Sequence, residues 1–359
     1  MSQSPSDRTE RPPGRRTSQP ELLRHSAMRW LAHHLLDRRE GGVHRAAPAA
    51  GGSPISGHKH LTDQSAAVLA LADNAPEELP IALQGLQALL DRDGRPGFSE
   101  VADRSWRVRP EGRARTLRHQ FHAATALLVG SRFTADPVAR VRAVDLLNRC
   151  LGTCRDGAFP GALSEDWKRT GDDAPSPLTA AAALRALAIA DALGESDVDT
   201  EQLPRMATAL GRAARELPTP GGEPRIALAL AHAARLLESA EHADAAHRTM
   251  AVTVRHFTSR EGASGISGGD AAHLLLAGAV LRSRGHDDCG ATAVSRAAID
   301  RLADRRHGGF HTVPGQAGDA SAVKYAQVQS VLAGALCAAS ALPTSHQGWP
   351  VEGARDADE

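Results

Sequence analysis

Two short segments of this 359-residue sequence combine residue types that can move protons. One holds His119 and His122 and the other holds Asp270 and His273, and the members of each pair are three positions apart. Histidine titrates near neutral pH, and a neighbouring carboxylate can hold it in one tautomer and raise its basicity. These residue types predict general acid–base catalysis, with His273 or His119 as base or acid, His122 beside His119, and Asp270 orienting His273.

Two further segments carry groups that can bind oxygen atoms. A lysine ammonium or a tyrosine hydroxyl beside a carbonyl oxygen can steady an enolate as it forms. Lys59 and Asp63 are four positions apart and are expected to share one helix face, and Tyr325 is the only tyrosine of the chain. The residues predicted to bind a substrate are Lys59, Asp63, Gln64, Lys324, Tyr325 and Gln329.

Each of these patterns also has a purely structural interpretation. The chain contains 17 histidines, so pairs at a spacing of three arise by chance, and Lys59 with Asp63 can be an ordinary helix ion pair. The basic run from Trp106 to Arg118 suits either a phosphate or carboxylate group or a solvated loop. The patterns become a site only if the fold brings them together.

The elements that must position these residues follow a repeating plan. A helix ends, a Gly-rich turn follows, and an Ala/Leu-rich helix begins, as in the segment 307–329 and, with a longer loop, in the segment 37–72. A capping box, Ser18 with Glu21, starts the first helix, and Thr62 or Asp63 is expected to cap the second. The turns lie near Gly41, Gly94, Gly157, Gly221, Gly262 and Gly308.

Six helical hairpins at this spacing predict an all-α fold, an (α/α)6 toroid. The second helix of each hairpin is the more apolar, as expected if it belongs to an inner ring that is covered on both sides. An open α-solenoid is the alternative. In a toroid the glycine-rich turns collect on one face, and the first turns of the inner helices converge on a central pocket.

Composition narrows the class of protein. Lys and Arg together number 42, as do Asp and Glu, so no net charge attracts nucleic acid or a membrane surface. The four cysteines, with Cys150 and Cys154 as the nearest pair, fit neither a disulfide scaffold nor a common zinc spacing. We expect a cytoplasmic protein without metal or cofactor, whose partner is a carbohydrate-like small molecule; the oligomeric state is open.

The expected domain organisation is simple. The polar segment 1–19 is predicted to be a disordered lead, 20–343 the toroid domain, and 344–359 a loose acidic tail. The lead lacks the apolar core of a signal peptide, and no run of about 18 apolar residues predicts a membrane helix.

Several of these segments resemble the N-acylglucosamine 2-epimerase and six-hairpin superfamily. GGVHR at 41–45 with KHLTDQ at 59–64 looks like the helical portion of bacterial proteins of the spermatogenesis-associated type, which carry a thioredoxin-like domain ahead of the toroid; that domain is not expected in this chain. Phe98-Ser99-Glu100 and the segment 172–188 are similar to later parts of the same helical portion.

The resemblance implies a pocket in which two histidines exchange a proton at a sugar carbon beside the carbonyl group. In the family one histidine lies in a PGH-type motif and the other in a YHxVR-type motif. Here Asp270 stands where the first histidine belongs and His273 where an acid belongs, whereas Ala326 and Gln329 replace the second histidine and the arginine. The resemblance therefore supports the fold better than it supports 2-epimerase activity.

Three functions follow from these observations. The first is an epimerase- or isomerase-like enzyme that acts on a carbohydrate or related small molecule by proton transfer. The second is a degenerate toroid that binds a ligand or protein partner without turnover. The third is a glycan hydrolase or lyase, which for a hydrolase requires two pocket carboxylates, or a terpenoid cyclase. Asp63 with Asp270, or Glu165 with Asp166, are the candidate carboxylates, and the acidic Asp197-Val198-Asp199 segment is the feature that suggests a cyclase.

Overall fold

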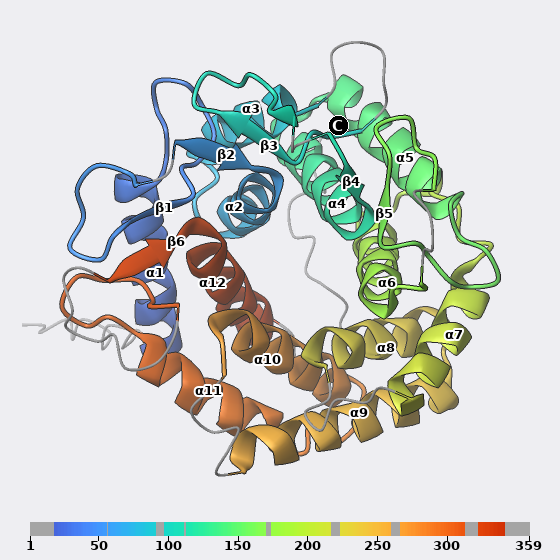
Figure 1. Cartoon of the computed structure of the whole chain (residues 1–359). Coiled ribbons are helices and arrows are strands. Elements are labelled where there is room, and N and C mark those ends of the chain that lie inside the picture. Colours follow the sequence, from blue (N-terminus) through green and yellow to red (C-terminus); the bar gives the residue numbers. More distant parts are fainter. Residues whose placement is uncertain are drawn as a thin grey trace, which may run out of the picture.

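The computed structural model shows two concentric layers of helices that close into a ring (Figure 1). The structure describes residues 18–55, 57–90, 97–110, 113–169, 174–216, 223–259, 266–312 and 322–341. The inner helices are α2 (Leu61–Asn74), α4 (Leu117–Thr134), α6 (Pro177–Ala192), α8 (Pro224–Leu236), α10 (Gly268–Ser283) and α12 (Ala326–Ala341). The outer helices are α1 (Gln19–His34), α3 (Leu79–Ala88), α5 (Pro137–Leu151), α7 (Leu203–Glu216), α9 (Ala240–Thr258) and α11 (Ala291–Leu302).

Each inner helix packs against the next, and α12 packs against α2. This contact closes the ring and confirms the (α/α)6 toroid over an open solenoid. The inner helices are rich in buried alanine and leucine on several sides, as in the AAAALRALA sequence of α6. Small side chains allow the close approach of a helix that has neighbours on either side and an outer helix behind it.

Of the two N-terminal caps predicted from the sequence, the structure confirms one. The carboxylate of Glu21 accepts a hydrogen bond from the backbone N–H of Ser18, which confirms the predicted capping box of α1. Asp136 caps α5 by accepting the N–H groups of Val138 and Ala139. The cap predicted for α2 is wrong, because this helix begins at Leu61 and Asp63 already lies inside it.

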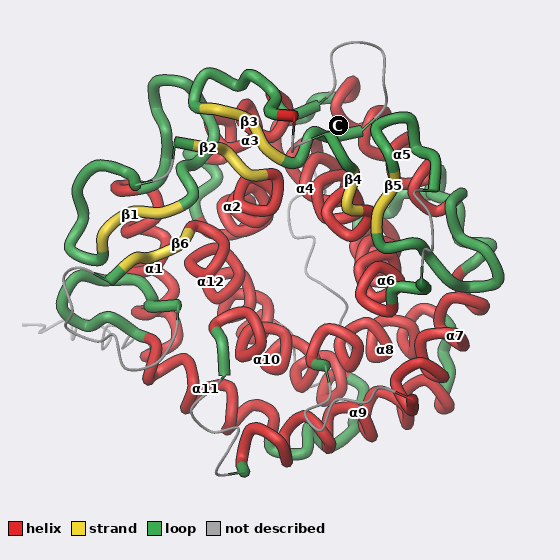
Figure 2. Tube along the Cα trace, viewed as in Figure 1, coloured by secondary structure: helices red, strands yellow, loops and turns green. Residues whose placement is uncertain are grey.

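Short β pairs that the sequence did not predict connect neighbouring hairpins at the turns (Figure 2). In antiparallel pairing β1 joins β6, β2 joins β3, and β4 joins β5. The strands are β1 (Ala46–Pro48), β2 (His58–His60), β3 (Val101–Asp103), β4 (Arg115–Thr116), β5 (Ala162–Leu163) and β6 (Val323–Tyr325). The β1–β6 pair links the first hairpin to the last and so adds a second connection across the point of closure.

These strands change the placement of several predicted residues. Lys59 lies in β2 and not in the first turn of α2, so the predicted helix pair of Lys59 with Asp63 does not exist. Likewise, Lys324 and Tyr325 lie in β6, immediately before α12.

Among the described residues, no helix is both long and apolar enough to cross a bilayer. The predicted lead, apart from Ser18 and Gln19, and the whole predicted tail lie outside the described residues. The same holds for the predicted turns at Gly94, Gly221 and Gly262.

Candidate functional site

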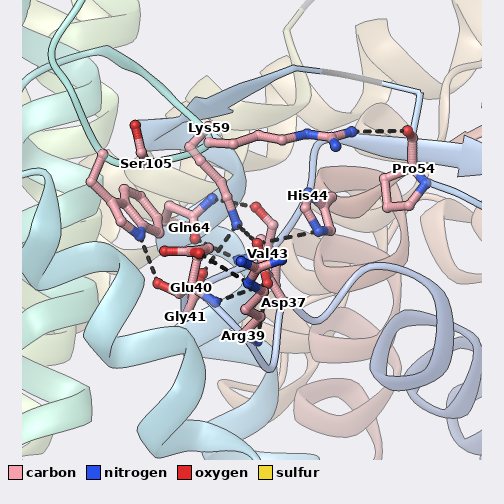
Figure 3. Close-up of polar contacts among 12 residues, drawn as sticks. Asp37, Arg39, Glu40, Gly41, Val43, His44, Pro54, Lys59, Gln64 and Ser105 are labelled. Atoms are coloured by element: carbon pink, nitrogen blue, oxygen red, sulfur yellow. Dashed lines mark hydrogen bonds and ion pairs between the residues drawn. The ribbon is translucent and has the colours of Figure 1, made fainter.

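Lys59 is fully buried, and its ammonium bonds to the turn that follows α1 (Figure 3). Its ammonium lies 2.8 Å from the Asp37 carboxylate, 3.0 Å from the Gly41 carbonyl oxygen and 4.9 Å from the centre of the Trp106 ring. Burial is the largest single effect and works to raise the pKa of Asp37, but the hydrogen bonds from Lys59 and from the Glu40 N–H, together with the charge of Lys59, outweigh it and the pKa is lowered. Asp37 is thus ionised at neutral pH, and the pair closes the turn.

Lys324 repeats this arrangement in the last hairpin. It is also fully buried, and its ammonium lies 2.8 Å from the Asp304 carboxylate and 5.0 Å from the centre of the Trp30 ring, and it donates to the Gly308 carbonyl. Desolvation opposes ionisation of Asp304, but the hydrogen bond from Lys324 leads the effects that hold its pKa well below the usual range. We use the term staple for a buried cation at a turn together with the groups that it contacts.

A third staple uses arginine. The guanidinium of Arg115 is buried and donates to the carbonyl oxygens of Phe98, at 3.0 Å, and Glu165, at 3.1 Å. Its central carbon lies 5.7 Å from the centre of the Trp167 ring. Staples therefore recur in hairpins one, two and six, and in each of them an indole ring covers the cation.

A buried glutamine follows each staple cation by five positions. Its side-chain amide accepts the backbone N–H of a turn residue and donates to the carbonyl of that same residue, at distances between 2.6 and 2.9 Å. The clamps are Gln64 on Val43, Gln120 on Phe98 and Gln329 on Phe310. Each clamp satisfies both the backbone N–H and the backbone carbonyl of one buried turn residue, which is a structural role.

The clamps explain two of the glycines in the turns. At Gly42, with φ of +71°, an added Cβ would lie 2.4 Å from the Gln64 amide oxygen, and at Gly309, with φ of +72°, it would lie 2.5 Å from that of Gln329. Only glycine combines this backbone conformation with this approach.

None of the residues predicted to bind a substrate lines the cavity described below. Lys59, Lys324, Gln64 and Gln329 belong to staples and clamps. Asp63 is buried where α2 meets α12 and accepts the Gln327 backbone N–H, and burial raises its pKa to about 7. The Tyr325 ring stacks under Arg45 at 5.9 Å.

A narrow hollow opens on the inner wall of the ring, between helices α4, α6, α8 and α10. Its wall combines small apolar side chains with cations and histidines. It is lined by Arg118, His122, Leu178, Ala181, Ala182, Arg185, Arg225, Leu228, Ala229 and His273.

The two histidines of this cavity come from opposite inner helices, α4 and α10. His273 bonds through Nδ1 to the Gly269 carbonyl oxygen at 2.6 Å. Because a carbonyl can only accept, Nδ1 carries the proton and Nε2 is left with the lone pair. Burial, followed by the charge of Arg185, lowers the pKa of His273 to about 4 and that of His122 well below its usual range. Both are neutral at pH 7, and each is able to accept a proton.

His119 and Asp270 lie next to the cavity but are bound elsewhere. Nδ1 of His119 is 2.7 Å from the Glu100 carboxylate, and Arg118 approaches its Nε2 at 3.4 Å. Asp270 accepts the hydroxyl of Ser267, the N-cap of α10, at 2.8 Å. Asp270 therefore does not orient His273, whose Nδ1 is bound to its own helix.

Arg118 of the cavity ends the basic run 106–118 that was considered for a phosphate or carboxylate group, whereas Arg185 and Arg225 were not predicted. Among the described residues Arg185 has no hydrogen bond or ion pair, whereas Arg225 makes two bonds to Glu223, at 2.7 and 2.8 Å. Burial alone lowers the pKa of Arg185. The available signal was a lone cation within the Ala-rich α6, on a helix that the fold predicted to be covered.

One group of potential metal ligands lies outside the cavity. Within the described part of the chain, only His247, Asp287 and Cys289 bring three ligand atoms within 4.8 Å of one another. The Cys289 sulfur is 3.0 Å from Nε2 of His247. Burial raises the pKa of Cys289, so its thiol is protonated at neutral pH. The predicted Cys150 and Cys154 are free thiols.

No family model matches the sequence, and no curated protein matches it. Solved structures match its fold. The chain superimposes on the cellobiose 2-epimerase from Spirochaeta thermophila with a TM-score of 0.63 and 16% identity, covering 90% of this chain and 98% of that one. A D-mannose isomerase matches with a TM-score of 0.67 and 14% identity over 89% and 97% of the two chains.

A different class of enzyme has the same fold. The α-1,6-mannanase from Salegentibacter sp. matches with a TM-score of 0.62 and 12% identity over 90% of this chain and 99% of that one. Identities this low establish a shared toroid, and the chemistry must be argued from the side chains of this chain.

Proposed function

We propose that this protein is a carbohydrate isomerase or epimerase in which His122 and His273 move a proton at the carbon beside a carbonyl group. One histidine removes the proton through its unprotonated ring nitrogen and, as the imidazolium so formed, returns it to the neighbouring carbon in an isomerisation. In an epimerisation the second histidine first takes up a proton from water and then delivers it to the opposite face of the same carbon. A general base must be unprotonated and within reach of the carbon. The observation that carries the proposal is the pair of neutral histidines from α4 and α10 on one cavity.

The cavity wall suits the intermediate of this reaction. Removal of a proton beside a carbonyl group places negative charge on the carbonyl oxygen. Arg118, Arg185 and Arg225 line the same hollow, so the charge would develop in a positive and largely apolar surrounding, where such stabilisation is strongest. In the sequence-based hypothesis this role fell to Lys324 and Tyr325, which the structure places in β6.

The similarity to the cellobiose 2-epimerase and the D-mannose isomerase is consistent with this chemistry. A glycan hydrolase is less well supported, because it requires two carboxyl groups beside the scissile bond. Among the described residues that line the cavity there is no carboxylate. Of the predicted carboxylates, Asp63 is buried between α2 and α12, and Asp270 is bound to Ser267.

A second candidate is a binding protein without turnover. It is favoured by Asp270 and Ala326, which stand where the resemblance places the two family histidines. The four residues Lys59, His119, Asp270 and Lys324 also fail to line a common cavity.

Solvent exchange separates the two candidates. The protein is incubated with D-mannose and with cellobiose in D₂O, and proton NMR measures both the loss of the hydrogen beside the carbonyl group and the appearance of isomers. We expect incorporation of deuterium by wild type and a loss of about 10²- to 10⁴-fold in His122→Asn and in His273→Asn, because each removes one proton-transfer group.

The exposed His33→Asn is the matched control and should exchange at the wild-type rate. Exchange that survives in both cavity variants would show that other residues carry the proton. Binding of sugars without any exchange by wild type would favour the binding protein.

A further inference from the structure

The cavity holds a charge that a neutral sugar does not match. Arg185 is a guanidinium on the wall of an otherwise apolar stretch of α6, and none of the described residues offers it a carboxylate or an acceptor. Its side chain is partly buried. A cation that is withdrawn from bulk water is costly without a partner, and such charges in proteins are normally paired or bound to a ligand.

The other cations of the cavity differ in this respect. Arg225 is paired with Glu223 and also lies near Asp270. Arg118 has Glu223 and Glu100 close enough to favour its charge. In the part of the chain that the structure describes, no carboxylate gives Arg185 a comparable counter-charge, and the charge of Arg185 disfavours protonation of the nearby histidines.

The proposed reaction does not by itself give the Arg185 guanidinium a lasting counter-charge. An enolate oxygen carries negative charge only during turnover, so a neutral sugar would leave Arg185 unpaired in the resting complex. A permanent anion would pair it throughout. The planar guanidinium forms two parallel hydrogen bonds with a carboxylate or a phosphate, which makes these the groups it recognises best.

We propose that Arg185 is the anchor for an anionic group and that the ligand of this cavity is an acidic sugar, bearing a carboxylate or a phosphate. Ala181, Ala182 and Ala229 line the hollow together with Arg185, so the wall around this cation includes small side chains, and His122 and His273 line the same hollow. The inference rests on the proposed function in taking the cavity as a carbohydrate site.

Calorimetric titration tests this directly. The probes are D-glucuronate, D-glucose 6-phosphate and D-glucose, with inorganic phosphate to measure the anion alone. We expect wild type to bind at least one of the two acidic sugars roughly 10- to 100-fold more tightly than D-glucose, the range for hydrogen bonds to a charged group. The acidic sugar that binds more tightly identifies the anion.

Arg185→Met keeps the length of the side chain and removes the charge and the donors. It should abolish the preference for the acidic sugar, and Arg185→Lys, which keeps a cation without the fork, should retain part of it. The exposed Arg142→Met is the control and should leave every affinity unchanged. Because none of the described residues pairs with Arg185, Arg185→Met should unfold at the wild-type temperature or above it.

Equal affinity of wild type for the acidic and neutral sugars would overturn the inference, as would a preference that persists in Arg185→Met. A strong loss of thermal stability in Arg185→Met would also contradict it, since it would give Arg185 a structural partner. The exchange experiment, run also with the acidic sugar that binds, tests the isomerase separately. Histidine-dependent exchange without anion preference defeats only this inference, and anion preference without exchange defeats only the isomerase.

Discussion

Replacement of Lys59 by methionine should destabilise the fold, although the sequence alone predicted Lys59 to bind a substrate. Methionine keeps most of the apolar stem but removes the ammonium. The Asp37 carboxylate would then remain largely buried, with only 9% of its side chain exposed, and without its cation. The Gly41 carbonyl would lose its donor as well.

The expected cost is about 3–5 kcal/mol, the range for removal of one partner from a buried ion pair. Proteins are stable by only about 5–15 kcal/mol, so this one staple accounts for a substantial share of the total. In the double variant with Asp37→Asn, the uncompensated charge is gone. We therefore expect the double variant to be more stable than Lys59→Met alone.

Urea unfolding followed by circular dichroism measures this loss as a lower midpoint. The chain supplies its own control, because it contains only three lysines and Lys168 is the exposed one. Lys168→Met should unfold at the wild-type urea concentration, and Lys324→Met should resemble Lys59→Met because it breaks the equivalent staple.

A Lys59→Met midpoint equal to that of Lys168→Met would refute the reasoning. If Lys59→Met were fully stable but did not bind any sugar, the original hypothesis of a substrate-binding lysine would be restored.

Two other predictions concern buried polar groups. Gln120→Leu should cost about 2–4 kcal/mol in urea unfolding, because it breaks both hydrogen bonds of a clamp; the exposed Gln327→Leu should cost little, and equal effects would exclude the clamp. Burial raises the pKa of Asp63 from 3.8 to about 7, so its stabilising contribution is complete below pH 3.8 and is lost as the pH rises through 7. Asp63→Asn should therefore gain about 3–4 kcal/mol over wild type between pH 4 and pH 8, measured by urea unfolding at each pH, and a difference that does not vary with pH would contradict the raised pKa. The effect of His232 on stability has the opposite pH dependence, because burial lowers its pKa to about 3. Its contribution to the free energy of unfolding is present above pH 6.5 and is lost as the pH falls, so the stability of wild type should also decline in acid.

The fold was predictable because it depends on patterns that repeat over many residues. Apolar spacing in six pairs of segments identified the inner and outer helices, and the number of hairpins indicated closure. The β pairs were not predictable in the same way. A strand of two or three residues such as Arg115–Thr116 has no period to detect, and its partner, Ala162–Leu163, lies in the next hairpin.

The candidate site was predicted only in part. His122 and His273 were identified by residue type and by their position near the start of an inner helix. The same rule also selected Lys59 and Gln64. It was wrong for these two residues because the turns fold back over the ends of the helices and accept hydrogen bonds from both side chains. A repeated signal was present, a lysine or arginine five positions before a glutamine, at 59–64, 115–120 and 324–329. A polar pattern that recurs in several hairpins of one ring indicates a structural role in each hairpin. A single ligand site would require such residues in one place only.

Hydrogen-bond partners separate structural from functional residues in this protein better than residue type does. The ammonium of Lys59 and the amide of Gln64 are satisfied by their own turns, so a ligand could gain little from them without breaking the fold. Arg185 and Nε2 of His273 differ, because they face the cavity with unused capacity that folding left unsatisfied. A buried cation without a partner reduces stability, and such a cost is expected where binding rather than folding requires the residue. On this reasoning Arg185, which no motif identified, is the strongest single indication that the toroid binds a ligand.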